Sequence, residues 1–278
     1  MTDFSYVLDE PAFVPILESV DRTISLAAQA DIPGLFAEIP THVFGVLAAL
    51  RPTRYPNISA WLPAMPPEHV QKQYVGFAGT EAIGRSVEFV DEAVRHFERE
   101  GRKIRDARIL DYGVGWGRIL RLFYKFVPTA QTCGVDVMPK IFEIVQGLGF
   151  RSKFILAPAL PTGRVCEEDM DLIWAFSVFT HLSERGADHV LAAMRSNLAD
   201  DGLAIITIRP REFCRSHRPD LLTSYDTRGF AFVSQAGDYG DTAMSLEFFK
   251  KRWPQWRVEH VSWDQANYMQ IKLYLRKA

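Results

Sequence analysis

Cysteine is scarce in this sequence, and neither sign of charge is in clear excess. The 278 residues include three scattered cysteines, Cys133, Cys166 and Cys214, and no CxxC motif. An odd number of isolated cysteines argues against a disulfide framework and against a cysteine-based zinc site. The net charge of -2 gives no overall attraction to phosphate backbones. We therefore expect no duplex nucleic acid as a substrate.

Long apolar runs are also absent. The longest apolar stretch of helical character, VFGVLAAL at residues 43–50, is far shorter than the ~20 residues that span a bilayer. The first residues, MTDFSYVLDEP, lack the basic start and apolar core of a secretory signal. We therefore expect no membrane insertion and a cytoplasmic location. The shares of hydrophobic residues, 47%, and charged residues, 24%, are ordinary for a folded globular chain.

The pattern of the sequence changes near residue 100. Before it, from about residue 11, apolar residues recur at three-to-four spacing, as in SVEFVDEAVRHF at 86–97, and predict helices. The prolines of WLPAMPPEHV, residues 61–70, predict a loop. After it, short apolar runs alternate with helical ones, which favours a parallel sheet covered by helices on both faces.

The expected strands are rich in Ile, Val and Leu and lie at residues 108–113, 130–137, 150–157, 171–178, 202–209, 256–263 and 269–277. The expected helices of this part lie at residues 118–127, 140–149, 186–199 and 245–253. The stretch from Pro210 to about Ala243 interrupts the alternation. A loop of this length in a compact domain is usually functional, so we expect it to cover the substrate.

Three alternate glycines stand in the stretch ILDYGVGWGRILRLF, residues 109–123. A strand that ends at Asp111 and turns through Gly113, Gly115 and Gly117 into a helix would expose backbone N–H groups at the carboxyl edge of the sheet, where ligands bind. The dinucleotide fingerprint G-x-G-x-x-G would need its third glycine where Arg118 stands, so the spacing disfavours a pyrophosphate and NAD.

A carboxylate follows at the end of the next expected strand, TCGVDV. Asp136 is placed to accept hydrogen bonds from two ribose hydroxyls, as an acid does after the second strand of nucleoside-binding sheets. The two features together predict a nucleoside-containing ligand.

The chain resembles the class I S-adenosylmethionine-dependent methyltransferases from about Arg108 to its end. The resemblance is carried, in this order, by LDYGVGWG, GVDV, DMDLIWAFSVFTHLSE and LADDGLAIITI. The strings YGVGWGR and SVFTHL are similar to a bacterial group whose characterised relatives often methylate sugars, glycans or small metabolites. The segment MPPEHVQKQYVGFAG, residues 65–79, is similar to an N-terminal helical region of that group.

The resemblance implies a Rossmann-like, doubly wound α/β fold with a seven-stranded mixed sheet whose last strand is antiparallel. It implies a methyltransferase domain over residues 101–278, with a substrate insertion at about 210–243, and a helical region over 1–100 that covers the active site. The cofactor is then S-adenosylmethionine, and the product S-adenosylhomocysteine.

The resemblance also assigns residues to the cofactor. The amides of the glycine loop meet its methionine end, Asp111 holds its amino group, Asp136 binds the ribose, and Val137 lines the adenine. Ala157 and Pro158 stand where a polar side chain usually contacts adenine. Adenine recognition is left to backbone groups there or to the segment from Cys166 to Asp169. The remaining predicted cofactor residues are Phe176, after the fourth strand, and Tyr74, at the start of the glycine-containing segment YVGFAG. Tyr74 can contact the cofactor or can be a packing residue.

The residues after the fourth expected strand indicate the reaction type. The Asn-Pro-Pro-Tyr string of amino-directed nucleic acid enzymes is missing, and neither a cysteine nor a Mg²⁺-binding acid stands at residues 175–177. Direct in-line transfer to an aligned acceptor remains, and no metal is expected. His181 can act as its base or can brace the following helix. Ser177 is expected to be a buried hydroxyl, because no nucleophile elbow surrounds it.

Aromatic and basic side chains leave further alternatives open. Tyr112 and Trp116 can face the sulfonium or can be packing residues. The segment RPREFCRSHRPD, residues 209–220, is either an anion-binding cluster or a solvated surface. In this segment the predicted substrate residues are Arg209 and Arg211. Two tyrosines farther along, Tyr225 and Tyr239, can contact acceptor hydroxyls.

The predicted function is methyl transfer from S-adenosylmethionine to an oxygen, in second place a nitrogen, of a small molecule or sugar that can be anionic. The alternatives are a non-catalytic methyltransferase-like binding protein and an NAD-dependent oxidoreductase. The sequence leaves the acceptor and the oligomeric state undecided.

Overall fold

The computed structural model describes residues 4–99, 101–263 and 269–278. The chain divides into two compact units. The first unit comprises Met1–Arg108 and Val114–Leu156, and the second comprises Ile109–Gly113 and Ala157–Ala278. The predicted domains, residues 1–100 and 101–278, stay a prediction.

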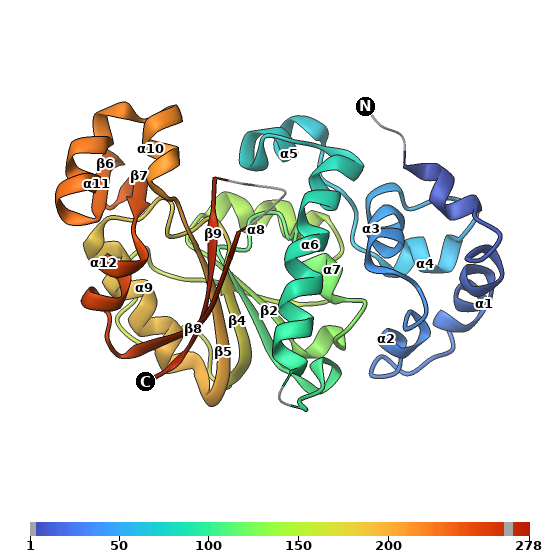
Figure 1. Cartoon of the computed structure of the whole chain (residues 1–278). Coiled ribbons are helices and arrows are strands. Elements are labelled where there is room, and N and C mark those ends of the chain that lie inside the picture. Colours follow the sequence, from blue (N-terminus) through green and yellow to red (C-terminus); the bar gives the residue numbers. More distant parts are fainter. Residues whose placement is uncertain (1–3, 100, 264–268) are drawn as a thin grey trace. The chain divides into compact units, whose positions relative to one another are not determined.

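The first unit begins with a series of helices (Figure 1). They are η1 (Ser5–Asp9), α1 (Val14–Ile24), α2 (Ile32–Leu35), α3 (Thr41–Leu50), α4 (Pro56–Trp61), α5 (Glu68–Val75), α6 (Gly79–Glu98) and η2 (Ile104–Asp106). Pro15, Pro33 and Pro56 stand in the first turns of α1, α2 and α4, where a missing N–H costs nothing. The apolar stripe expected at 86–97 lies inside α6 and is largely buried.

The proline-rich loop predicted at residues 61–70 is shorter in the structure. Helix α5 already begins at Glu68, directly after Pro66 and Pro67. Proline is compatible with the position before a helix, because the first N–H groups of a helix have no partner within it. Gly76, with a φ of 79°, ends α5 in the left-handed conformation.

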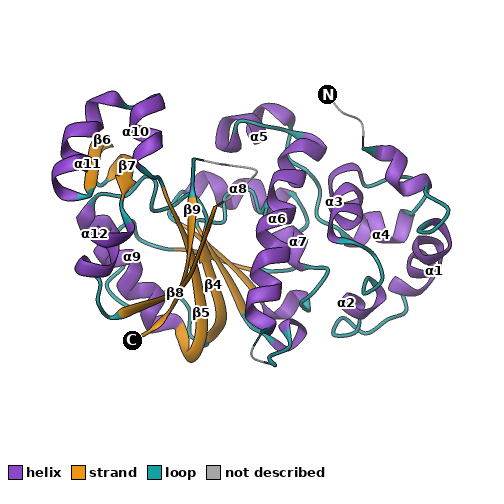
Figure 2. Ribbon diagram, viewed as in Figure 1, coloured by secondary structure: helices purple, strands orange, loops and turns teal. Residues whose placement is uncertain are grey.

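The seven main strands are β1 (Ile109–Tyr112), β2 (Thr132–Asp136), β3 (Lys153–Leu156), β4 (Met170–Ala175), β5 (Leu198–Ile208), β8 (Trp256–Trp263) and β9 (Ile271–Lys277). They form one mixed sheet in the order β3-β2-β1-β4-β5-β9-β8 (Figure 2). Strand β9 runs antiparallel to β5 and to β8, whereas β4 runs parallel to β1 and β5. The predicted α/β class and the antiparallel last strand are confirmed.

The helices between the strands are α7 (Leu120–Phe123), η3 (Thr129–Gln131), α8 (Pro139–Gly147), α9 (Glu184–Asn197) and α12 (Leu246–Arg252). Ser183 and Ser245 cap the N-termini of α9 and α12. Their hydroxyl oxygens accept hydrogen bonds from the amides of Gly186 and Phe248.

The helix predicted at residues 118–127 is wrong in its length. Only Leu120–Phe123 is α-helical, and turns flank it on both sides. The amides of Leu122, Tyr124 and Lys125 bond three residues back instead of four. The β-branched and aromatic residues of this segment have modest helix propensity, and burial among other elements decides its conformation.

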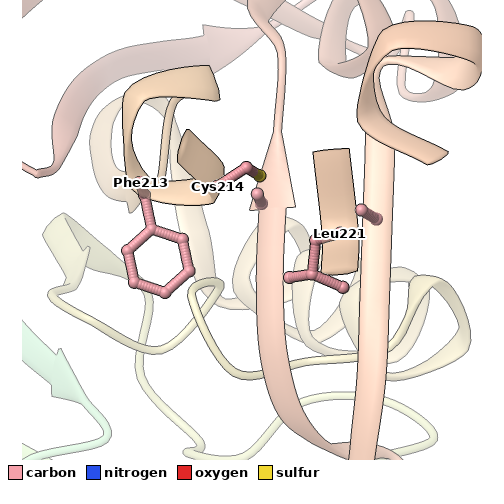
Figure 3. Close-up of a cluster of buried hydrophobic side chains, with 5 residues drawn as sticks. Phe213, Cys214 and Leu221 are labelled. Carbon is pink, nitrogen blue, oxygen red and sulfur yellow. The ribbon is translucent and has the colours of Figure 1, made fainter. Parts of the chain in front are cut away.

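The stretch predicted as a loop between Pro210 and Ala243 is folded. It forms α10 (Arg211–His217), η4 (Pro219–Leu221), α11 (Leu222–Arg228) and a hairpin of β6 (Phe230–Ala236) and β7 (Tyr239–Met244). These elements lie together in the second unit (Figure 1). They share a small core, which Figure 3 shows in part and which consists of Phe213, Cys214, Leu221, Ala231 and Ala243. Polar residues of this stretch such as Glu212, Arg215 and Asp220 are exposed, whereas Thr242 is buried.

Candidate active site

The glycine loop, residues 113–117, holds its three glycines in left-handed conformations, with φ values of 79°, 52° and 77°. Residues that carry a side chain rarely adopt such backbone angles. A Cβ on Gly113 would lie 2.4 Å from Val178 Cγ2, and one on Gly117 would lie 2.3 Å from Phe150 Cζ. A Cβ on Gly115 would meet no described atom within 4 Å. The chain itself thus requires glycine at two positions, and at Gly115 the space beside the backbone is open.

Asp136 at the end of β2 is hydrogen-bonded to this loop. One carboxylate oxygen accepts a hydrogen bond from the Gly115 amide at 3.0 Å, and the other accepts one from the Met138 amide at 3.0 Å. The residue is 8% exposed. Burial raises the pKa of Asp136, although hydrogen bonds from the amides of Gly115, Met138 and Val137 oppose that shift. The two oxygens together offer about four acceptor sites, so the carboxylate can still accept a hydroxyl donor beside these amides.

Arg121 holds the backbone of the loop in place and was not among the residues predicted from the sequence. Its guanidinium donates to the carbonyl oxygens of Gly117 at 3.2 Å and Trp116 at 3.4 Å, and to those of Pro63 and Ala64 at 3.2 Å. The residue is fully buried. An arginine inside the apolar stretch RILRLF was the signal available in the sequence, because a buried charge needs a full set of partners.

The second residue after β4 is conformationally strained. Ser177 has a φ of 60°, which is uncommon for a residue other than glycine. Its amide donates to Thr207 Oγ1 at 2.7 Å, and its hydroxyl lies 3.2 Å from both Thr180 Oγ1 and Gln270 Nε2. Such strain persists only where the surroundings enforce it, and it is common at functional sites. The predicted Phe176 is half-buried beside it.

His181 lies in the segment between β4 and α9, and this segment pairs with β7. Its Nδ1 lies 2.8 Å from the Gly240 carbonyl oxygen, so Nδ1 carries the proton. Its Nε2 faces Arg209 Nη2 at 3.4 Å, and its ring stacks on Tyr239. Burial, followed by the charge of Arg209, lowers the pKa of His181, while Gly240 and Asp241 oppose the shift. The imidazole is therefore neutral, and both of its nitrogens have partners within the chain.

The predicted cluster of arginines is largely neutralised by carboxylates. Asp241 of β7 accepts from Arg209 at 2.9 Å and from Arg218, whose other nitrogens bind Asp220. Burial opposes ionisation of Asp241, but the two arginines outweigh it and lower its pKa. Arg209 also donates to the Thr180 carbonyl oxygen at 2.8 Å. An anionic acceptor would have to compete with these partners.

The other predicted substrate residues lie on the same folded insertion. Arg211 binds Asp226 through two hydrogen bonds of 2.6 and 2.7 Å on the surface. Tyr225 packs against the core of the insertion, and burial raises its pKa to about 12. Tyr239 is 52% exposed beside His181. Of these side chains, Tyr239 is the one whose ring is open to a ligand.

The remaining predicted cofactor residues have ordinary surroundings. Asp111 is 3% exposed at the end of β1, opposite Trp174 in the register with β4. Val137 is 41% exposed, and Ala157 is buried. Tyr74 is half-buried on α5.

The segment from Cys166 to Asp169 does not reach the carboxyl edge, so its suggested contact with adenine is wrong. It precedes β4, and Asn197 at the end of α9 donates to the Cys166 carbonyl oxygen at 2.8 Å. Arg164 also binds Asp169 at 2.8 Å. These residues thus lie at the amino end of the strand, because β4 runs from Met170 to Ala175.

The two aromatic residues of the glycine loop region are core residues. Trp116 is 1% exposed and Tyr112 is 2% exposed. The Arg121 guanidinium lies 5.1 Å from the Trp116 ring. The packing alternative is therefore favoured over contact with a sulfonium.

Three further features of the described residues bear on ligands. A cavity of about 560 Å³ lies among η1, α3 and α6, and no predicted site residue lines it. No group of three or more His, Cys, Asp or Glu side chains in the described part of the chain could hold a metal ion. Among the same residues, no helix has both the length and the apolar character of a membrane span.

A family model described as a methyltransferase domain matches residues 109–202. The matched segment contains the glycine loop, Asp136, β4 and His181. No curated protein matches the sequence.

Solved structures with this fold include several methyltransferases. An S-adenosylmethionine-dependent methyltransferase from Clostridium acetobutylicum ATCC 824 has a TM-score of 0.50 and 11% identity, over 76% of this chain and 97% of that chain. Magnesium protoporphyrin IX methyltransferase from Synechocystis PCC 6803 with bound S-adenosylhomocysteine has a TM-score of 0.51 and 12% identity, over 75% and 93%. The glycopeptide N-methyltransferase MtfA with sinefungin has a TM-score of 0.50 and 9% identity, over 68% and 94%.

Proposed function

We propose that this chain, whose residues 109–202 match a family model described as a methyltransferase domain, transfers the methyl group of S-adenosylmethionine to a small molecule or sugar. The acceptor atom is an oxygen, in second place a nitrogen. The reaction takes place at a cytoplasmic location. The acceptors named for the structural neighbours differ from one another, so the shared fold alone does not choose between them.

The observation that carries the proposal is the hydrogen bond between Asp136 and the Gly115 amide. It joins the two elements that the cofactor needs, a loop with open space over its backbone and a carboxylate with free lone pairs. S-Adenosylmethionine binds with its ribose at Asp136 and its methionine end over the loop. Asp111 takes the amino group, and Val137, Ala157 and Phe176 line the nucleoside.

The chemistry that the chain itself must supply is alignment. The sulfonium brings an activated methyl group, so the protein has to hold the acceptor in line with it and exclude water. The strained Ser177 stands two residues after the end of β4, where its position is fixed by Thr207 and Thr180. A fixed position of this kind suits the alignment of an acceptor hydroxyl.

His181 has two possible contributions to this reaction. As a base it would accept the acceptor's proton at Nε2 after Arg209 moves away from that nitrogen. As a positioning residue it joins the segment after β4 to β7, through Gly240 and the stacked ring of Tyr239. The pH profile of kcat separates the two, because only a base gives an inflection that His181→Gln removes.

The proposal is tested by incubating the purified chain with labelled S-adenosylmethionine and fractionated metabolites, followed by mass spectrometry. A fraction that gains a methyl group, with S-adenosylhomocysteine formed in equal amount, is the expected result. Tight cofactor binding without turnover on a broad acceptor panel would favour the non-catalytic alternative. A rise in melting temperature with NAD, and none with S-adenosylhomocysteine, would favour the oxidoreductase.

A further inference from the structure

The glycine loop cannot owe a positive potential to the helix that follows it. A macrodipole equivalent to about half a charge needs several turns of aligned peptides. Helix α7 has four residues, from Leu120 to Phe123. Any attraction of the loop for an anion must therefore come mainly from its own amides or from a nearby charged side chain.

Arg121 is a charged side chain in the right place. Its Nε and Nη2 atoms donate to the carbonyl oxygens of Gly117 and Trp116, so the guanidinium touches the loop directly. It is 0% exposed, and solvent therefore screens its field little. Its hydrogen-bond partners in the described part of the chain are carbonyl oxygens and the Met65 sulfur, none of them a carboxylate.

The guanidinium stays charged at neutral pH. Burial lowers the pKa of Arg121 to about 9, which still leaves the cation dominant at pH 7. A buried cation without a carboxylate partner is unusual, because ion pairing is the common way to offset its desolvation. Here carbonyl dipoles, the Met65 sulfur and the rings of Trp116 and Phe150 offset the cost, and no carboxylate among these partners neutralises the charge.

We propose that Arg121 is a positioning residue of the cofactor site whose unpaired charge, behind the glycine loop, attracts the carboxylate of the cofactor's methionine end. The inference rests on the proposed function and deepens it. A unit charge within about 10 Å of a carboxylate, at an effective dielectric constant of about 20, changes affinity by on the order of tenfold or more.

The test compares two ligands that differ only in the carboxylate. They are S-adenosylhomocysteine and its decarboxylated analogue, 5′-deoxy-5′-(3-aminopropylthio)adenosine, and their Kd values are measured by calorimetry at pH 7. We expect the wild-type chain to prefer S-adenosylhomocysteine by roughly tenfold or more. In Arg121→Met that preference should shrink to about threefold or less, and in Arg121→Lys most of it should remain.

A merely structural role of Arg121 predicts another pattern. Loss of loop support would weaken both ligands alike and leave the ratio of their Kd values unchanged. Lys125→Met is the matched control, because Lys125 is also a buried cation but lies over the Phe126 ring, 4.5 Å from its centre, and not on the loop. This control should keep the wild-type ratio.

Three results would overturn the inference. An unchanged ratio in Arg121→Met is the first, and an equal loss of the ratio in Lys125→Met is the second. The third needs no variant and holds even if Arg121→Met does not fold: equal affinity of the wild-type chain for both ligands. A wild-type chain that binds neither ligand would instead overturn the proposed function itself.

Discussion

Asp136 has two tasks in this account, to fix the Gly115 amide and to bind the ribose. Its replacement by alanine removes hydrogen bonds to a charged group, worth about 1.5–3 kcal/mol. We predict that Asp136→Ala lowers the affinity for S-adenosylhomocysteine roughly ten- to a hundredfold, measured by calorimetry. Asp226→Ala, which removes a surface carboxylate of the insertion, serves as the control and should bind normally.

The raised pKa of Asp136 gives a pH dependence with a definite sign. Burial favours the protonated form, so this carboxyl takes up a proton at a higher pH than an ordinary aspartate near 3.8. Binding of ribose hydroxyls needs the ionised form. Affinity for S-adenosylhomocysteine should therefore fall as the pH is lowered through the raised pKa of Asp136, and Asp136→Asn should show no such inflection. An inflection of equal size in both proteins would contradict this assignment.

The same shift acts on folding in the opposite direction. An acid with a raised folded pKa binds its proton more tightly in the folded state, so its contribution to stability is greatest at low pH and decreases as the pH rises through that window.

Some site residues could be predicted from the sequence, and others could not. The glycines and Asp136 stand at fixed distances from strand ends, and such local spacing survives folding. Arg121 and Gln270 act through partners that lie 58 and 93 residues away in the chain. Pairings of that length depend on tertiary packing, which a single sequence does not display. The pairing of Arg209 with Asp241 was missed for the same reason.

The glycine loop offers a matched pair of substitutions at the level of the element. Gly115→Ala meets open space, so its cost to folding is the left-handed backbone alone, about 1–2 kcal/mol. Its methyl group would occupy the space assigned to the cofactor. We predict a small drop in melting temperature and a loss of S-adenosylhomocysteine affinity of tenfold or more.

For Gly117→Ala we expect the effect on stability to be the larger one. Its Cβ would lie 2.3 Å from Phe150 Cζ, so folding must displace a ring in addition to adopting the strained backbone. The larger loss of melting temperature should therefore belong to Gly117→Ala. Equal stability of the two variants, measured by thermal unfolding, would count against the packing described for this loop.

Asp241 of the insertion, residues 210–243, pairs with Arg209, which in turn donates to the Thr180 carbonyl oxygen after β4. Asp241→Asn leaves Arg209 largely buried without its counter-charge, and we predict a loss of unfolding free energy of about 1–3 kcal/mol, measured by urea denaturation. Asp226→Asn removes the exposed pair with Arg211 and should change stability less. The lowered pKa of Asp241 also means that its stabilisation is lost as the pH falls through that pKa.

Two predicted elements were wrong because local composition suggested one conformation and tertiary packing stabilised another. The insertion looked like a loop because its surface residues are polar, yet five small or apolar side chains suffice for its core. The helix at residues 118–127 looked continuous because its apolar spacing is helical, yet burial shortened it to Leu120–Phe123. In both cases contacts outside the local window decided the outcome.

For the whole molecule, the alternation of apolar runs was the strongest predictor. It gave the α/β class and the positions of the seven main strands, because hydrophobic periodicity reports burial directly. The antiparallel last strand came from the resemblance to a known family. The strand order was not predicted, since periodicity carries no information on which strands are neighbours. The two compact units place β2 and β3 with the N-terminal residues, whereas the sequence predicted a boundary near residue 100, and that boundary stays a prediction.

The central claim is that the glycine loop and Asp136 together hold an adenosyl cofactor. A crystal structure of the chain with S-adenosylhomocysteine tests it most directly. In that structure we expect the ribose hydroxyls within hydrogen-bond distance of the Asp136 carboxylate, and the homocysteine part over residues 113–117. A ligand bound elsewhere on the chain, with Asp136 in contact only with its own backbone, would contradict the account.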